Sequence, residues 1–194
     1  MNKLRFHFVI ITLCFFSFLL MAGTLTFNTL AFKKAKVDFD AYEKLISQVK
    51  DHRKDRLVNV DEFKRMSSQE NVVILDTRSD NMFKSKHIKG AVHLNFSDFT
   101  QANLAGLIPD KETKILIYCN NNFEGDEVNF ASKVMRPRPP EKTKQEITLA
   151  LNIPTYINLY GYGYKNVYEL SELVHVLDGR LEYEGSAVVN NKIK

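Results

Sequence analysis

Two short apolar runs constrain the fold of this chain more than any other feature. Residues 72–75 (Val-Val-Ile-Leu) and 115–118 (Ile-Leu-Ile-Tyr) are unbroken, rich in β-branched residues and shorter than buried helices. Such runs are typical of strands that are buried on both faces of a parallel sheet. Asp76 follows the first run and Cys119 follows the second. Each strand therefore leads from the hydrophobic core to a residue whose side chain can take part in a chemical reaction.

Helical and strand patterns alternate around these two runs. Weaker strand patterns lie at residues 57–60, 92–94 and 166–170, and helical patterns lie at 61–67, 82–87, 126–134 and 142–151. Asp61 is the expected N-cap of the first of these helices. This alternation predicts an α/β fold with an open, mainly parallel sheet and helices on both faces. Ligands of such sheets bind beyond the carboxyl ends of the strands, where Asp76 and Cys119 are expected.

The N-terminus has the pattern of a targeting segment. Lys3 and Arg5 precede a nearly continuous apolar run over residues 6–27, which is typical of a secretory signal peptide. Counted through to Leu30, the run also has the length of a membrane anchor, which needs about 20 residues. In either case the positive charges stay inside and the rest of the chain is exported. We expect residues 1–31 to be a signal peptide or an N-terminal anchor of a periplasmic or otherwise extracytoplasmic protein.

The remainder of the chain predicts one domain. A length of 194 residues with 44% hydrophobic residues suits one well-buried core. We expect a charged tether and amphipathic helix over residues 32–56, a folded domain over 57–185, and a loose polar tail over 186–194. The net charge of +4 is small, and no basic stripe interleaved with aromatic residues is present. This pattern argues against nucleic-acid binding, and the expected membrane contact is limited to the N-terminal segment.

Cys119 is the only cysteine outside the apolar N-terminal run. Oxidising compartments favour paired cysteines, so a lone one indicates an intermolecular bridge or a thiol kept for its reactivity. The alternative is a cysteine that acts only as a small buried hydrophobe. Between a buried strand and a helix, the thiol would face backbone N–H groups and the positive end of the helix dipole, which favour the thiolate. The histidines have no metal-ligand spacing, so neither a metal nor another cofactor is expected.

Five segments in order resemble the rhodanese family. They are residues 75–78 (LDTR), 83–91 (FKSKHIKGA), 115–119 (ILIYC), a predicted helix with Phe130-Ala131, and 163–170 (GYKNVYEL). The resemblance covers residues 57–185 and implies a rhodanese-like sulfurtransferase. By this resemblance, Cys119 carries sulfur as a persulfide between a donor and an acceptor thiol or cyanide. Asp76 and Arg78 match the family's residues that support the scaffold beside the active loop.

The loop that follows Cys119 departs from the pattern of active sulfurtransferases. Its backbone amides are the expected anion cradle, contributed by Asn120, Asn121, Asn122, Phe123, Glu124 and Gly125. If Ala131 matches the small residue of the family's next helix, this loop is slightly longer than usual and contains no Arg or Lys. Glu124, Asp126 and Glu127 are expected to raise the pKa of the thiol and to repel thiosulfate. Efficient thiosulfate:cyanide transfer is therefore not expected, and the missing arginine argues against a phosphatase.

Two functions remain open from the sequence. The first is a sulfurtransferase that acts on a small sulfur-containing or thiol substrate, or on a protein thiol. The second is a catalytically inactive rhodanese-fold module that binds a partner protein through its tyrosine-rich edge (156–168) and its Arg-Pro arm (136–140). Thiol reactivity well below pH 8.5, about the pKa of free cysteine, would indicate the enzyme. A buried or unreactive thiol would indicate the module.

Overall fold

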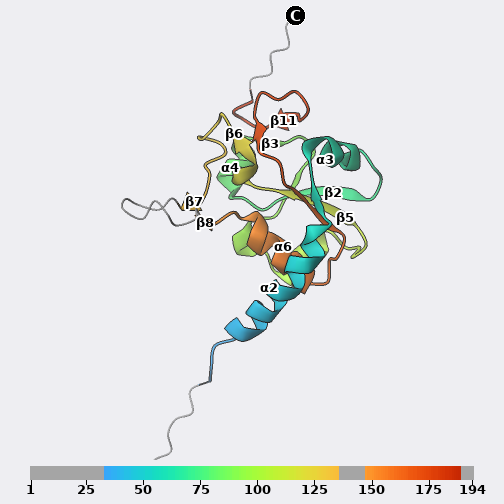
Figure 1. The fold of residues 1–194 in the computed structure, drawn as a ribbon, viewed down its shortest axis with the longest axis vertical. Coiled ribbons are helices and arrows are strands. Elements are labelled where there is room, and N and C mark those ends of the chain that lie inside the picture. The colour runs from blue at the N-terminus through green and yellow to red at the C-terminus, as the bar shows by residue number, and fades with distance from the viewer. Residues whose placement is uncertain (1–32, 136–146, 189–194) are drawn as a thin grey trace, which may run out of the picture. The chain divides into compact units, whose positions relative to one another are not determined.

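A five-stranded parallel sheet forms the centre of the protein (Figure 1). The computed structural model describes residues 33–135 and 147–188. In spatial order the strands are β1 (Leu57–Val58), β9 (Val167–Leu170), β5 (Lys114–Tyr118), β2 (Val72–Asp76) and β4 (Val92–His93). The two apolar runs form β2 and β5, which pair along their whole length, from Val72 with Lys114 to Asp76 with Tyr118. The predicted α/β fold with a mainly parallel sheet is confirmed.

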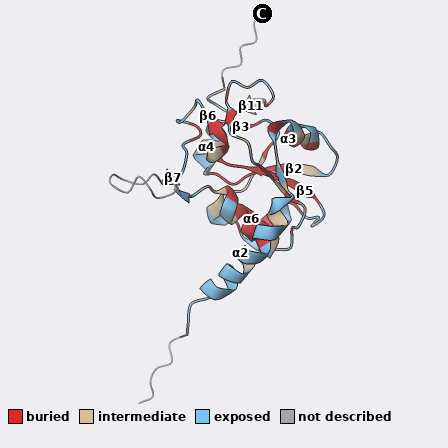
Figure 2. Cartoon of the chain, in the orientation of Figure 1, coloured by how far each residue is buried: buried red, intermediate tan, exposed pale blue. Residues whose placement is uncertain are grey.

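Helices cover both faces of the sheet. One face carries α2 (Phe39–Lys54), α5 (Gln101–Leu107) and α6 (Asn152–Gly161), and the other carries α3 (Val60–Ser67) and the short α4 (Asp80–Ser85). Side chains of β5 alternate between two hydrophobic clusters: Ile115 and Ile117 pack with α6, and Leu116 and Tyr118 pack with α3. This alternation follows from the two-residue period of a strand. The red strands at the centre of Figure 2 are therefore buried on both faces.

Three short strand pairs lie outside the central sheet. β3 (His87–Ile88) pairs antiparallel with β11 (Tyr183–Glu184), β6 (Phe123–Glu124) pairs parallel with β10 (Val174–His175), and β7 (Val134–Met135) pairs antiparallel with β8 (Ile147–Thr148). Two single turns of 3₁₀ helix, η1 (Phe96–Asp98) and η2 (Asn120–Asn122), complete the described elements. The pairs with β6 and β7 fix the segment that follows Cys119.

The two helices expected after β5 are absent from the described residues. Residues 126–133 are irregular and lead into β7, while 147–148 form β8; residues 142–146 lie outside the described part. A single turn does start, since the Phe130 N–H donates to the Asp126 carbonyl over 2.8 Å. The turn then stops because Phe130, only 1% exposed, packs in the α3-side core. The helix that follows β5 and covers the sheet is α6, which begins at Asn152.

Helix starts also differ from the expectation in detail. The N-cap of α3 is Asn59 rather than Asp61, because the Asn59 Oδ1 accepts the Glu62 N–H over 2.9 Å. Helix α5 was not expected; its N-cap is Thr100, whose hydroxyl accepts the Asn103 N–H over 3.1 Å. In α5 only Leu104 is buried, so the helix lacks a strong apolar period.

The compact unit is longer at both ends than the predicted domain of residues 57–185. It begins at Phe39 and so includes α2. At the other end, the backbone N–H groups of Ser186 and Ala187 donate to carbonyls of α4, so the tail is held at its start. The predicted export segment (1–31), the Arg-Pro arm (136–140) and residues 189–194 lie outside the described residues. Among the helices that are described, none is both long and apolar enough to cross a bilayer.

Candidate active site

Cys119 lies at the carboxyl end of the middle strand, at the bottom of a small pocket. The pocket has a volume of about 130 Å³, and Cys119 is 2% exposed. Its other lining residues are Arg78, Ser79, Met82, Asn120, Asn121, Lys133 and Leu151. They come from the end of β2 and from α4 on one side, and on the other from the two ends of the segment between β5 and α6 and from Lys133 just before β7.

Opposing effects act on the Cys119 thiol. Burial is the largest and raises its pKa, and the Glu169 carboxylate adds to this rise. Backbone N–H groups of Asn152, Asn121 and Leu151 bond to the sulfur and lower the pKa, without offsetting the rise. Two of these three amides belong to the N-terminus of α6, whose dipole also favours an anion. The amides that face the sulfur therefore come from two segments, not from one loop.

Only two of the six expected cradle residues line the pocket, namely Asn120 and Asn121. Phe123 instead packs among aromatic rings, with its centroid 4.4 Å from that of Phe130. Glu124 pairs with β10. Gly125 has φ +84° and lies against the His175 ring. The chain thus turns away from Cys119 after Asn122, because β6 joins β10.

The buried Asn122 carboxamide links Cys119 to α6. Its Oδ1 accepts the Cys119 N–H over 2.9 Å and the Asn152 Nδ2–H over 3.1 Å. Its Nδ2 donates to the Leu170 carbonyl over 2.7 Å. One side chain therefore fixes the backbone at Cys119, the first turn of α6 and the end of β9.

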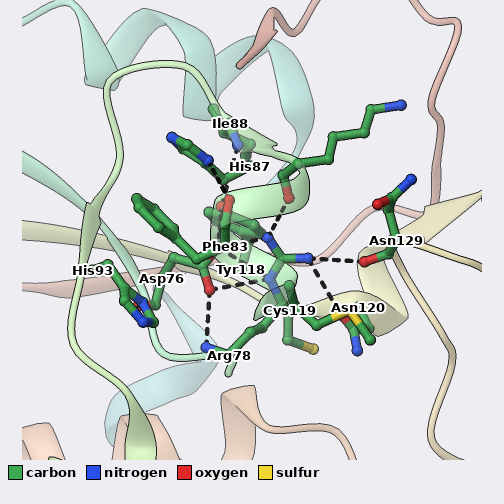
Figure 3. A network of polar contacts seen from close by, with 12 residues as sticks. Asp76, Arg78, Phe83, His87, Ile88, His93, Tyr118, Cys119, Asn120 and Asn129 are labelled. Carbon is green, nitrogen blue, oxygen red and sulfur yellow. Dashed lines mark hydrogen bonds and ion pairs between the residues drawn. The ribbon is translucent and has the colours of Figure 1, made fainter. Parts of the chain in front are cut away.

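Asp76 and Arg78 form a buried ion pair beside Cys119 (Figure 3). The Arg78 Nη2 lies 2.7 Å from Asp76 Oδ2, which also accepts the Tyr118 hydroxyl over 2.5 Å. Arg78 further donates to the side-chain oxygen of Asn120 and to the carbonyls of Asn129 and Lys86. Every nitrogen of the guanidinium is thus bonded within the protein. The structure places this arginine as a brace for the loop rather than as a free anion-binding group.

A second cation lies at the pocket wall. Lys133 lines the pocket, and its backbone N–H donates to the Asn121 side chain over 2.9 Å, which ties the two segments together. The resemblance predicts a basic residue close behind Cys119, and the sequence predicts a helix over residues 126–134. No sequence pattern therefore indicates that Lys133 reaches the pocket.

The acidic residues after Cys119 do not act on the thiol as expected. Asp126 pairs with Lys86 over 3.0 Å and also accepts from Asn129. Burial raises the pKa of Asp126, but its bonds to Lys86 and Asn129 outweigh that effect and lower it overall. The carboxylate among the main causes of the raised pKa of Cys119 is Glu169 on β9, not Glu124 or Glu127. Glu169 is 6% exposed, and a buried glutamate inside a strand was the signal that could have revealed it.

The comparison with protein families decides the assignment. A family model described as the rhodanese-like domain matches residues 59–179. The chain belongs to the rhodanese family. Within the described part of this rhodanese-like domain, no group of three or more His, Cys, Asp or Glu side chains is placed to hold a metal ion.

Several solved structures are similar to this rhodanese-like chain. The rhodanese with anions from E. coli is 15% identical, with 59% of this chain and 99% of that chain covered and a TM-score of 0.36. The BH2092 protein from Bacillus halodurans is 16% identical, with 76% and 88% covered and a TM-score of 0.42. The Alr3790 protein from Anabaena sp. is 18% identical, with 69% and 83% covered and a TM-score of 0.40. No curated protein matches the sequence significantly.

One element of the resemblance needs correction. Phe130 and Ala131 lie in irregular chain, not in a helix that follows Cys119. In this rhodanese-like domain the next helix after Cys119 is α6, so residues 120–151 separate Cys119 from that helix. The loop is therefore far longer than the alignment on Ala131 indicated.

Proposed function

We propose that this chain is an exported rhodanese-type sulfurtransferase that carries sulfur on Cys119 as a persulfide. The proposal rests on the groups that surround the Cys119 sulfur. It lines a pocket of about 130 Å³, and backbone N–H groups of Asn121, Leu151 and Asn152 converge on it. Converging amides stabilise an anion at the sulfur, whether thiolate or persulfide.

The reaction needs no cofactor. The Cys119 thiol loses its proton to water, and the thiolate attacks the outer sulfur of a donor such as thiosulfate. A new S–S bond forms, the S–S bond of the donor breaks, and sulfite leaves with the electron pair. An acceptor thiolate or cyanide then attacks the terminal sulfur of the persulfide, and Cys119 leaves as thiolate.

The pocket suits a small anionic donor or the end of a thiol side chain. Lys133 supplies positive charge at its wall, and Met82 and Leu151 supply apolar surface. The narrow volume excludes a bulky donor, whereas a thiol at the end of a flexible side chain, including one of a partner protein, can enter. The Lys3-Arg5 pair and the apolar run of residues 6–27 support function outside the cytoplasm.

A second candidate has an observation in its favour. Cys119 is buried and burial raises its pKa, as expected for a rhodanese-fold module that binds a partner without catalysis. In that case the pocket would take no sulfur donor. Its rim, the β7–β8 pair and the Arg-Pro arm would serve recognition alone.

Intact mass spectrometry distinguishes the two candidates. The purified chain with Cys14→Ser, so that Cys119 is the only thiol, is incubated with thiosulfate or a persulfide donor and then with cyanide. We expect a gain of about 32 Da, one sulfur atom, that cyanide removes. The matched control is the same chain with Cys119→Ser, which should gain nothing. Absence of the added sulfur with every donor would overturn the enzyme and favour the binding module.

A further inference from the structure

An ion pair ties helix α2 to the middle of the sheet behind the active cysteine. Arg53 Nε lies 2.5 Å from Glu169 Oε2, and Arg53 Nη2 lies 2.7 Å from Glu169 Oε1. Arg53 belongs to α2, which precedes the part of the chain matched by the family model, residues 59–179. The pair is therefore a connection between the rhodanese-like domain and an element added before it.

Glu169 lies on the same side of the sheet as the sulfur. On β5, Ile117 pairs in register with Glu169 of β9, and Cys119 follows two residues later, so its side chain points to the same face. The carboxylate is close enough to Cys119 to raise the pKa of the thiol. It is a buried negative charge one strand away from the sulfur.

Hydrogen bonds connect this charge to the groups around Cys119. Asn152 Nδ2 lies 3.4 Å from Glu169 Oε1 and 3.1 Å from Asn122 Oδ1, which in turn accepts the Cys119 N–H. The same Asn152 presents its backbone N–H to the sulfur. A chain of contacts thus runs from Arg53 through Glu169 and Asn152 to the nucleophile.

We propose that Arg53 is a positioning residue for the Cys119 thiolate: its guanidinium balances the Glu169 carboxylate and so sets the charge that the sulfur meets. The purpose of this role rests on the proposed function, because a positioned thiolate matters only if Cys119 reacts. The test does not rest on it, because the test measures the pKa of the thiol directly. The two charges act on the thiolate with opposite sign. Helix α2 is then part of the catalytic unit.

The effect of the Arg53–Glu169 pair on Cys119 must be present at the pH at which the thiol ionises. Burial raises the pKa of the Cys119 thiol, so the titration of the thiol extends to alkaline pH. Replacement of Arg53 by a neutral residue removes the positive charge that is paired with Glu169 beside the sulfur. A side chain that is 35% exposed, as Arg53 is, can be replaced without opening the core.

The test measures the rate of Cys119 alkylation by iodoacetamide against pH in the full chain with Cys14→Ser. Arg53→Gln should lower the rate at pH 7.5 roughly threefold to tenfold by raising the thiol pKa. Glu169→Gln should raise the rate by a similar factor. The double variant should return close to the parent, and Arg53→Lys should keep most of the parent's rate because it keeps the charge.

The opposite signs separate electrostatics from structure. Both single variants break the same ion pair, so a merely structural role would move the rate in one direction. The matched control is Arg65→Gln on α3, which breaks a bidentate pair with Glu62 on the opposite face of the sheet and should leave the profile unchanged. Circular dichroism checks that each variant is folded; if Arg53→Gln is not, Glu169→Gln and Arg53→Lys still decide.

Two results would overturn the proposal. One is a folded Arg53→Gln and a folded Glu169→Gln that both keep the parent's pH profile, and the other is a shift of both in the same direction. Because alkylation needs no sulfur donor, these results are independent of persulfide formation. A chain that fails to load sulfur can still give the predicted opposite shifts, so the two proposals fail separately.

Discussion

At the scale of residues, the reactivity of Cys119 is decided by a competition. Burial removes water from the sulfur and disfavours its charge, whereas three backbone N–H groups stabilise the charge. The first effect wins in the resting protein, so the thiol is mostly protonated at neutral pH. A substrate anion or a persulfide would gain from the same amides without the initial cost of ionising the thiol.

This balance predicts the pH dependence of the reaction with iodoacetamide. Because the folded chain has the higher thiol pKa, the neutral thiol adds stability below the free-cysteine pKa of about 8.5, and that stability is lost above it. With Cys14→Ser, we expect alkylation to be slow at pH 7 and to keep rising with pH above 8.5. Alkylation therefore does not separate the enzyme from the binding module, and the sulfur-loading experiment does. The same chain in denaturant serves as the control and should level off earlier. A folded protein that reaches its maximum rate below pH 8 would contradict the prediction.

At the scale of elements, the sequence revealed the strands better than the helices. β2 and β5 were predictable because a continuous β-branched run is suited to a strand buried on both faces. Helix α6 was missed since Pro154 and several β-branched or aromatic residues lower its intrinsic helicity. Proline is tolerated in the first turn, and packing on the sheet supplies the rest. The site was predictable for the residues directly after β2 and β5, and unpredictable where residues 133 and 151–152 return to it.

Gly125 in the turn after β6 and Gly106 in α5 offer a matched pair of glycine substitutions. Gly125→Ala forces a side chain into φ +84° and places its Cβ 2.5 Å from His175 Nε2, so it should destabilise the chain by about 1–3 kcal/mol. Gly106→Ala in α5 meets nothing within 4 Å and should stabilise it by about 0.5–1 kcal/mol. Urea unfolding measures both. Equal effects of the two substitutions would show that the β6–β10 pairing does not constrain this turn.

At the scale of the whole molecule, the compact unit is larger than the family match. The match begins at residue 59, whereas the compact unit begins at Phe39. Helix α2 buries Val49 in the α6-side core, and its His52 Nδ1 lies 3.0 Å from the Tyr156 hydroxyl. The sequence predicts an amphipathic helix within residues 32–56, and α2 confirms it. The sequence does not show where the helix packs, because its partner lies about a hundred residues later in the chain.

A truncation tests this enlarged unit. A chain that starts at Leu57 loses the packing of Val49 and leaves Glu169 buried without its arginine, so it should be less stable than one that starts at Lys33 by about 3–5 kcal/mol. Thermal and urea unfolding of the two chains measure the difference. Removal of residues 1–32 alone, compared with the full chain, is the control and should change little. Equal stability of the two truncated chains would show that α2 does not contribute to the stability of the domain.

The long segment between Cys119 and α6 has a consequence for how the protein folds. The sulfur and the amide of Asn152 belong to one site, yet about thirty residues must close into a loop before they meet, at an entropic cost that local contacts avoid. β5 can pair with β2 while α6 is still undocked. In such an intermediate the cysteine is exposed to solvent and lacks its amides. Protection of this one thiol against a pulse of alkylating reagent would therefore time the docking of α6 during refolding.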